Sequence, residues 1–225
     1  MNYKEVKQEI KKEYELLLKP LGYKSKNGLQ GCEFRNVNEF VVCKIGYGIT
    51  NYVDEFNIST YISLSVISID NIQQTIFGEN HILENYATIG SSISVYFNEL
   101  NYRYHIKTIE DIKEWGKIVR KFYNEYALLF FEKYNSVETI DKLLNDNPSE
   151  KVIYCNDLGW RIIKGLIAAK LNNNPKYNEL RDYYKSEVES KFQGYFMYDK
   201  CMKVIDFLDK YTSEELDKLA NVENI

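Results

Sequence analysis

The stretch Phe56-Asn57-Ile58-Ser59-Thr60-Tyr61-Ile62-Ser63-Leu64-Ser65-Val66 decides the fold of this chain. Its apolar side chains stand at every even position except 60, and the odd positions carry Asn, Ser and Tyr. Successive side chains of a β-strand point to opposite faces of the sheet. The alternation therefore predicts a strand with one buried face and one polar face.

An amphipathic helix precedes this strand and supplies the layer that covers its apolar face. Apolar residues recur there at three- and four-residue spacing, at Tyr3, Val6, Ile10, Tyr14, Leu17 and Leu21. This spacing gives a helix one apolar stripe. We therefore expect the helix to pack on one face of an antiparallel sheet.

Two β-hairpins are expected on either side of residues 56–66. The first joins strands at 29–35 and 39–47 through a turn at 36–38, with Cys32 opposite Cys43. The second joins 93–97 to 102–106, with Phe97 opposite Tyr102. In both registers the apolar sets of the paired strands meet on one face, which supports the pairing.

The remaining sequence is mostly helical. Apolar periodicity fails from Asp70 to Gly90, where we expect a loop with one short helix. Thr108 caps a long helix that runs to Tyr134, with Asp111 in capping-box position. Further helices are expected over residues 136–144, 157–171, 176–191 and 198–211, and a last one after the capping box of Thr212 and Glu215.

These elements predict an α+β fold. An N-terminal helix packs on an antiparallel sheet of about five strands, followed by a long helix and a C-terminal helical cluster. No linker rich in Pro, Gly or Ser separates the halves. We therefore expect a single domain over residues 1–225, with the helix and sheet in 1–107 and a helical half in 108–225 packed on it.

Composition narrows the classes of function. The formal net charge of −4 disfavours a general affinity for nucleic acid. The 20 tyrosines fit packing at the edge of the core, with the ring buried and the hydroxyl in water. No secretory signal follows Met1, and no apolar run reaches the length of a membrane span. We expect a cytoplasmic protein without a membrane partner.

The cysteines and histidines give no pattern for a metal centre. Cys32, Cys43, Cys155 and Cys201 lack C-x-x-C spacing, and the two histidines are His81 and His105. Zinc sites need clustered ligands with short, recognisable spacing. We expect no metal and no cofactor, and four thiols that act as small core residues.

The polar face of the predicted sheet is the main candidate for a binding site. Tyr and Arg are enriched in protein interfaces, and this face carries both. The alternative is a face that is only wetted by solvent or covered by the C-terminal helices. The candidate binding residues on this face are Glu33, Arg35, Lys44, Tyr61, Tyr96, Arg103 and His105.

Two other classes of function stay open. One is a hydrolase or nucleic-acid-processing enzyme with a dispersed site around His81, Glu84 or His105, although no catalytic constellation is identifiable. The other is a homo-oligomeric structural module that associates through a strand edge or a C-terminal helix.

One segment carries a family resemblance. Leu16-Leu17-Leu18-Lys19-Pro20-Leu21-Gly22-Tyr23-Lys24-Ser25-Lys26-Asn27-Gly28, followed by an aromatic strand residue at Phe34, resembles a bacterial family catalogued as domain of unknown function 4304. Its members open with a helix that ends in a leucine-rich Leu-x-Pro-Leu-Gly-Phe turn, followed by an antiparallel sheet. Tyr23 stands in place of the usual Phe, and Ser25 interrupts the basic run. The resemblance covers the first half of the chain.

The resemblance implies a bacterial protein of the helix-on-sheet type and supplies no catalytic residue. By analogy with small acidic immunity proteins, we expect a non-enzymatic binding protein that occludes a protein partner.

Overall fold

The computed structural model describes residues 1–28, 30–78 and 87–221. Its strands are β1 (Lys24–Asn27), β2 (Gly31–Val37), β3 (Val41–Asn51), β4 (Phe56–Val66), β5 (Ile89–Ser92) and β6 (Tyr104–Ile106). In the first two thirds of the chain the helices are α1 (Tyr3–Leu18), η1 (Lys19–Leu21), α2 (Ile67–Phe77), α3 (Ile93–Tyr96), α4 (Ile109–Phe122), η3 (Tyr123–Ala127), α5 (Leu128–Lys133) and α6 (Val137–Asn145). The last are α7 (Leu158–Leu171), α8 (Tyr177–Lys191), α9 (Phe196–Leu208) and α10 (Ser213–Ala220).

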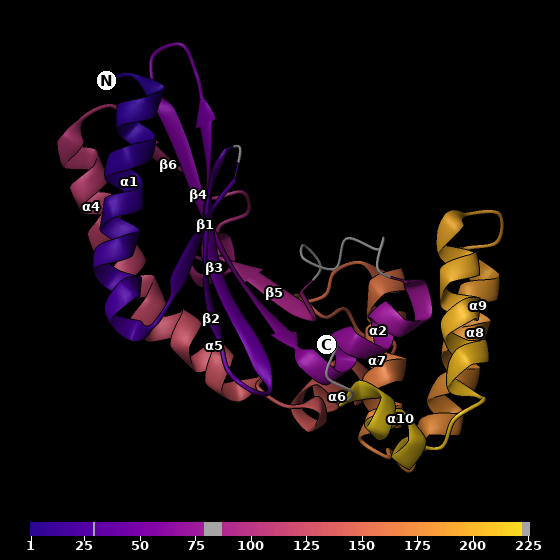
Figure 1. The fold of residues 1–225 in the computed structure, drawn as a ribbon. Coiled ribbons are helices and arrows are strands. Elements are labelled where there is room, and N and C mark those ends of the chain that lie inside the picture. The colour runs from indigo at the N-terminus through magenta and orange to yellow at the C-terminus, as the bar shows by residue number, and fades with distance from the viewer. Residues whose placement is uncertain (29, 79–86, 222–225) are drawn as a thin grey trace. The chain divides into compact units, whose positions relative to one another are not determined.

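The strands form one antiparallel sheet, so the predicted α+β fold is confirmed (Figure 1). The order is β1-β2-β3-β4-β5, and β6 pairs with β4. The strand predicted from residues 56–66 forms over those residues as β4. No helix in the described ranges combines the length and the apolar character needed to cross a membrane.

The first predicted hairpin forms, but its register was wrong. Cys32 lies opposite Tyr47 instead of Cys43, and Phe34 lies opposite Ile45. The reason is that β2 runs on to Val37, which moves the turn toward the C-terminus. The shift in register is an even number of residues, so the same side chains still face the core. Strand β1, at residues 24–27, pairs with β2 and was not predicted.

The second predicted hairpin was wrong. Residues 93–96 form the short helix α3, and the strands on either side of it, β5 and β6, both pair with β4 instead of with each other. In β6, His105 lies opposite Asn57. The physical reason is the length of β4, which has enough backbone donors and acceptors to serve one short strand near each end.

The expected helices are present with small shifts. Thr108 caps α4 with Asp111 in a capping box, and α4, a π-helical segment η3 and α5 follow one another to Lys133. Thr212 and Glu215 form the capping box of α10. The helix expected over 198–211 is α9, at 196–208. Of the 70–90 segment, residues 79–86 lie outside the described residues, and α2 precedes them.

The chain divides into two compact units, each with its own core. The first unit comprises Met1–Asn38, Val42–Leu64 and Gly90–Lys133, and the second comprises Glu39–Val41, Ser65–Ile89 and Tyr134–Ile225. The expectation of a single domain over 1–225 stays a prediction.

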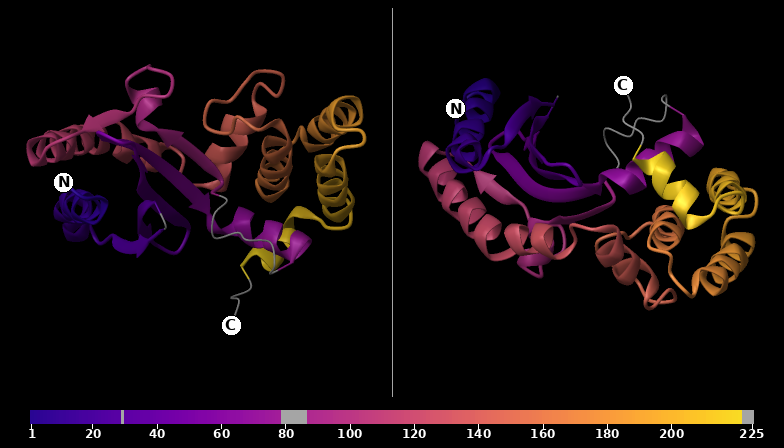
Figure 2. Two further views of the ribbon diagram at one scale, coloured as in Figure 1. Left: turned by 90° about the horizontal axis from the view of Figure 1, so that it is seen from above. Right: turned by 60° about the horizontal axis from the view of Figure 1, so that its bottom comes forward.

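In the first unit, α1 and α4 pack against each other on one side of the sheet (Figures 1 and 2). Tyr14 of α1 is fully buried there, with its ring 5.8 Å from that of Phe34 and 4.6 Å from that of Tyr47. Its hydroxyl is hydrogen-bonded to the buried hydroxyl of Thr60. Burial raises the pKa of Tyr14 well above its usual range, so the phenol stays protonated. This contact fixes α1 on the apolar face of β2, β3 and β4.

In the second unit, α7 is the central helix. Its sequence is apolar on most sides, and it contacts α2, α6, α8, α9 and α10. A helix that is apolar around its whole circumference is expected to be buried. The surrounding helices are amphipathic and pack their apolar sides inward.

The Tyr14→Phe variant tests the anchoring of α1. Removing one hydroxyl leaves the buried Thr60 hydroxyl without its partner, so we expect the free energy of unfolding of the first unit to fall by about 1–3 kcal/mol. Urea unfolding would be followed by the fluorescence of the buried Trp115, in a background where Trp160 is Phe. The matched control is Tyr52→Phe at an exposed position, with an expected change within about 0.5 kcal/mol. Equal effects of the two changes would contradict the anchoring role.

Candidate functional site

Three of the predicted site residues come together on the face of the sheet opposite α1 and α4. We call Glu33, Arg35 and Tyr61 the Tyr61 cluster. Glu33 and Arg35 stand two residues apart on β2, so they share a face, and Arg35 Nε donates to Glu33 Oε1 at 2.5 Å. Tyr61 is on β4, and β3 lies between the two strands.

Gly46 on β3 makes room for the Tyr61 ring. It lies opposite Glu33, and a Cβ atom built on it would come within 2.4 Å of the ring carbon and the hydroxyl of Tyr61. The ring therefore lies across the backbone of β3 toward the ion pair on β2. A glycine inside a strand often marks a close approach of this kind.

The cluster has a defined electrostatic setting. Burial raises the pKa of Tyr61, the charge of Glu33 raises it further, and Arg35 acts in the opposite direction. The phenol is thus neutral at physiological pH. At the same time 39% of the side chain is exposed, so the ring is supported from below and accessible from above. This arrangement offers an aromatic surface, a hydroxyl and a pair of opposite charges.

Of the other predicted site residues, Lys44 adjoins the cluster but is buried, and Arg103, His105 and Tyr96 lie elsewhere. Lys44 lies opposite Arg35 on β3 but is only 5% exposed. Arg103 is exposed and precedes β6, outside the strands. His105 is on β6, with Nδ1 2.7 Å from Glu55 Oε1, and this hydrogen bond is the main cause that lowers the pKa of Glu55.

Tyr96 was placed on a strand by the sequence and lies on helix α3 instead. Its hydroxyl donates to Glu125 at 2.6 Å, and its ring meets that of Phe122 edge-on at 5.7 Å. It therefore serves to pack α3 against the helical run from α4 to η3. His81 and Glu84, considered for an enzymatic site, lie outside the described residues.

Two of the cysteines are weakly reactive, and the described residues form no metal-binding group. Burial raises the pKa of Cys43 to about 11 and that of Cys201 to about 12. Such thiols are protonated at neutral pH and weakly nucleophilic. Within the described ranges, no group of three or more His, Cys, Asp or Glu side chains is placed to hold a metal ion.

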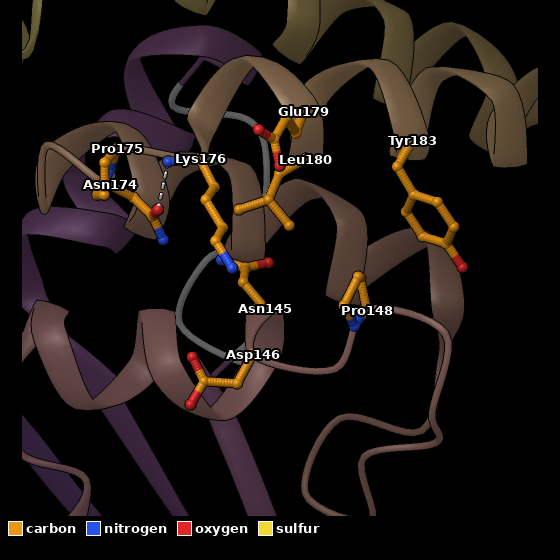
Figure 3. A pocket seen from close by; sticks show the side chains of 9 residues that line it. All are labelled: Asn145, Asp146, Pro148, Asn174, Pro175, Lys176, Glu179, Leu180 and Tyr183. Atoms are coloured by element: carbon orange, nitrogen blue, oxygen red, sulfur yellow. Dashed lines mark hydrogen bonds between the residues drawn. The ribbon is translucent and has the colours of Figure 1, made fainter.

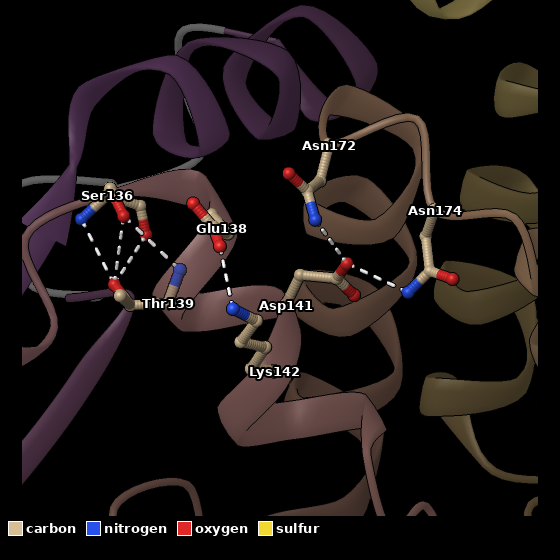
Figure 4. Close-up of polar contacts among 7 residues, drawn as sticks. All are labelled: Ser136, Glu138, Thr139, Asp141, Lys142, Asn172 and Asn174. Carbon is tan, nitrogen blue, oxygen red and sulfur yellow. Dashed lines mark hydrogen bonds and ion pairs between the residues drawn. The ribbon is translucent and has the colours of Figure 1, made fainter.

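The second unit contains a buried polar network that the sequence analysis did not find. The carboxylate of Asp141 on α6 is 1% exposed and accepts hydrogen bonds from three amides, of which those of Asn172 and Asn174 are drawn in Figure 4. Asn145 donates to it at 2.6 Å, and Asn172 and Asn174 each donate at 2.8 Å. Hydrogen bonds to the ionised form are what make a buried carboxylate tolerable.

The network joins three helices. Asn145 also donates to the backbone carbonyl of Gly165 on α7 and accepts from the hydroxyl of Tyr184 on α8. A Cβ atom at Gly165 would come within 2.7 Å of the side-chain oxygen Oδ1 of Asn145. The close approach of α6 and α7 therefore requires glycine at this position. Arg161 donates to the carbonyls of Leu144, Asn147 and Glu150 and so holds the segment that follows α6.

Comparison with protein families, with curated proteins and with solved structures finds no match to this chain.

Replacing Gly46 tests the support of the Tyr61 ring. In the Gly46→Ala variant the new methyl group meets the ring, so we expect a loss of about 1–3 kcal/mol in the free energy of unfolding of the first unit. Combined with Tyr61→Ala, the cost should fall by at least half, because the colliding ring is gone. Gly48→Ala is the matched control, since its nearest neighbour is the Ser59 hydroxyl at 3.8 Å. A cost at Gly46 that does not depend on Tyr61 would contradict the described contact.

Replacing Asp141 tests the buried network. The Asp141→Ala variant leaves the amides of Asn145, Asn172 and Asn174 without their shared acceptor, and we expect the second unit to lose about 2–4 kcal/mol. Unfolding would be followed by the fluorescence of Trp160 in a background where Trp115 is Phe. Asp146→Asn on the exposed surface nearby is the control and should change little. A small effect at Asp141 would show that the carboxylate does not organise this unit.

Proposed function

We propose that this chain is a non-enzymatic binding protein that contacts a protein partner through the Tyr61 cluster. The observation that carries the proposal is the position of Tyr61, whose ring rests on Gly46 beside the Glu33–Arg35 ion pair and is still partly exposed. Tyr and Arg are enriched among the residues that dominate binding energy in protein interfaces.

The surroundings of the cluster support close approach by a partner backbone. Several neighbouring positions on this face of β3 and β4 carry small side chains, at Gly48, Ser59 and Ser63. Lys44, the other neighbour of Gly46 on this face, is buried. Contact with Gly46 also restricts the Tyr61 ring before a partner arrives, so less conformational entropy is lost on binding. The ion pair gives a partner one acceptor and one donor at a fixed spacing, which favours specificity.

We propose an inhibitor of the immunity or defence-associated kind, which works in the cytoplasm by covering the active surface of its partner. The acidic composition and the resemblance of residues 16–28 to a bacterial family support this extension. A homo-oligomer through the sheet edge is less favoured, because β1 is short and presents Lys24 and Lys26, which discourage strand pairing.

The test is affinity capture with matched variants. The tagged chain is used to capture proteins from a lysate of the organism that encodes it, and the captured proteins are quantified by mass spectrometry. We expect one stoichiometric protein with the original chain and a loss of binding of about tenfold or more with Tyr61→Ala and with Arg35→Ala. The Tyr52→Ala variant, changed at an exposed tyrosine directly after β3, should bind like the original chain.

Circular dichroism and thermal melting would establish that each variant is folded. Recovery of the chain alone would contradict the proposal, and so would a partner whose binding is unchanged by Tyr61→Ala. Capture that weakens at high salt would assign part of the affinity to the charged pair.

A further inference from the structure

A pocket of about 420 Å³ opens in the second unit, next to the buried Asp141 network. It lies between the end of α6 and the beginning of α8 (Figure 3). Its volume falls within the range of small-molecule sites in proteins. The lining residues are Asn145, Asp146, Pro148, Asn174, Pro175, Lys176, Glu179, Leu180 and Tyr183.

The wall of the pocket is rigid because it belongs to the buried network. Asn145 is held by Asp141, Gly165 and Tyr184, as described above. Asn174 donates to Asp141 and accepts from the backbone amide of Lys176 at 2.9 Å. A site whose walls keep their positions without the ligand loses less entropy when the ligand binds.

Three charged side chains border the pocket. Lys176 extends along one side of it toward Asn145 and Asp146, and Glu179 stands one turn further along α8 (Figure 3). All three charged side chains are exposed, and within the described part of the chain no ion pair within 4.0 Å joins Lys176 to either carboxylate. The pocket thus presents one positive and two negative groups that a ligand can engage.

An apolar surface completes the pocket. The Leu180 side chain, which is buried, lies in its middle, and Pro148 and the ring of Tyr183 stand on the side away from Lys176 (Figure 3). A ligand that fits these walls carries an apolar body next to its charged end. This combination of a few polar groups with apolar lining is typical of small-molecule sites.

We propose that this pocket binds a small zwitterion with an apolar side chain, of the size of an amino acid or a dipeptide. Its carboxylate pairs with Lys176, its ammonium group with Asp146 and Glu179, and its side chain packs on Leu180 and Tyr183. A ligand with only a negative group would meet repulsion from two carboxylates, and one with only a positive group would meet repulsion from Lys176. The site is independent of the proposed protein-binding face.

The test compares probes that carry one or both charges. Isothermal titration calorimetry on the full chain would use L-phenylalanine, L-leucyl-L-phenylalanine, phenethylamine, which lacks the carboxylate, and phenylpropionate, which lacks the ammonium group. We expect L-phenylalanine or the dipeptide to bind. The affinities of the two single-charge probes should be lower by about tenfold or more.

Variants assign the binding to the pocket. Lys176→Gln should weaken binding of the zwitterion by about tenfold, because the carboxylate contact is lost. The same change should tighten binding of phenethylamine, because the repulsion between its ammonium group and Lys176 is removed. Lys185→Gln, an exposed lysine on the same helix outside the pocket, is the control and should have no effect. Glu179→Gln should weaken binding of the zwitterion and of phenethylamine, and it should tighten binding of phenylpropionate, because one of the two repelling carboxylates is removed. All three positions are exposed, and thermal melting would verify that the variants are folded.

Two results would overturn the proposal. The first is that neither zwitterion binds at concentrations up to about 10 mM. The dissociation constant would then be larger than a functional site of this size requires. The second is binding that Lys176→Gln and Lys185→Gln change equally, since the affinity would then come from elsewhere on the chain.

Discussion

The burial of Tyr14 is the constraint on which the first unit depends. A phenol can enter an apolar core only if its hydroxyl finds a partner, and the hydroxyl of Thr60 supplies it. Thr60 is the one polar residue among the inward positions of β4, so the hydrogen bond sets where α1 crosses the sheet. With α1 and α4 on this face, the odd positions of β4 are left on the opposite face. The polar side chains at these positions, and Tyr61 among them, therefore face away from α1 and α4.

Much of this fold could be predicted from the sequence because its signals are local. Alternation along 56–66 and the capping boxes at Thr108 and Thr212 need only neighbouring residues, and they were confirmed. The register of Cys32 was wrong because it depends on where β2 ends, which the pattern leaves open by several residues. The second hairpin was wrong because alternation shows which side chains share a face and not which strand is the partner. The length of β4 decided that pairing.

The candidate site, too, could be predicted from the sequence only in part. Strand parity was enough to place Glu33 and Arg35 on one face of β2 and Tyr61 on the matching face of β4. The contact of Tyr61 with Gly46 could not be predicted, because it depends on the direction of a side chain across a neighbouring strand. The Asp141 network was missed for a related reason. Two of its three amides, those of Asn172 and Asn174, come from positions about thirty residues away in sequence. A run of three asparagines after a helix is equally typical of a loop.

We propose that a protein partner binds the face of the sheet opposite α1. Site-specific photo-crosslinking tests it most directly, with a benzoylphenylalanine residue placed at Ser59, beside Tyr61 on the outer face of β4, or at Leu16, an exposed position on α1. We expect a crosslinked partner from position 59 and none from position 16. A crosslink from position 16 alone, or equal crosslinking from both positions, would contradict it.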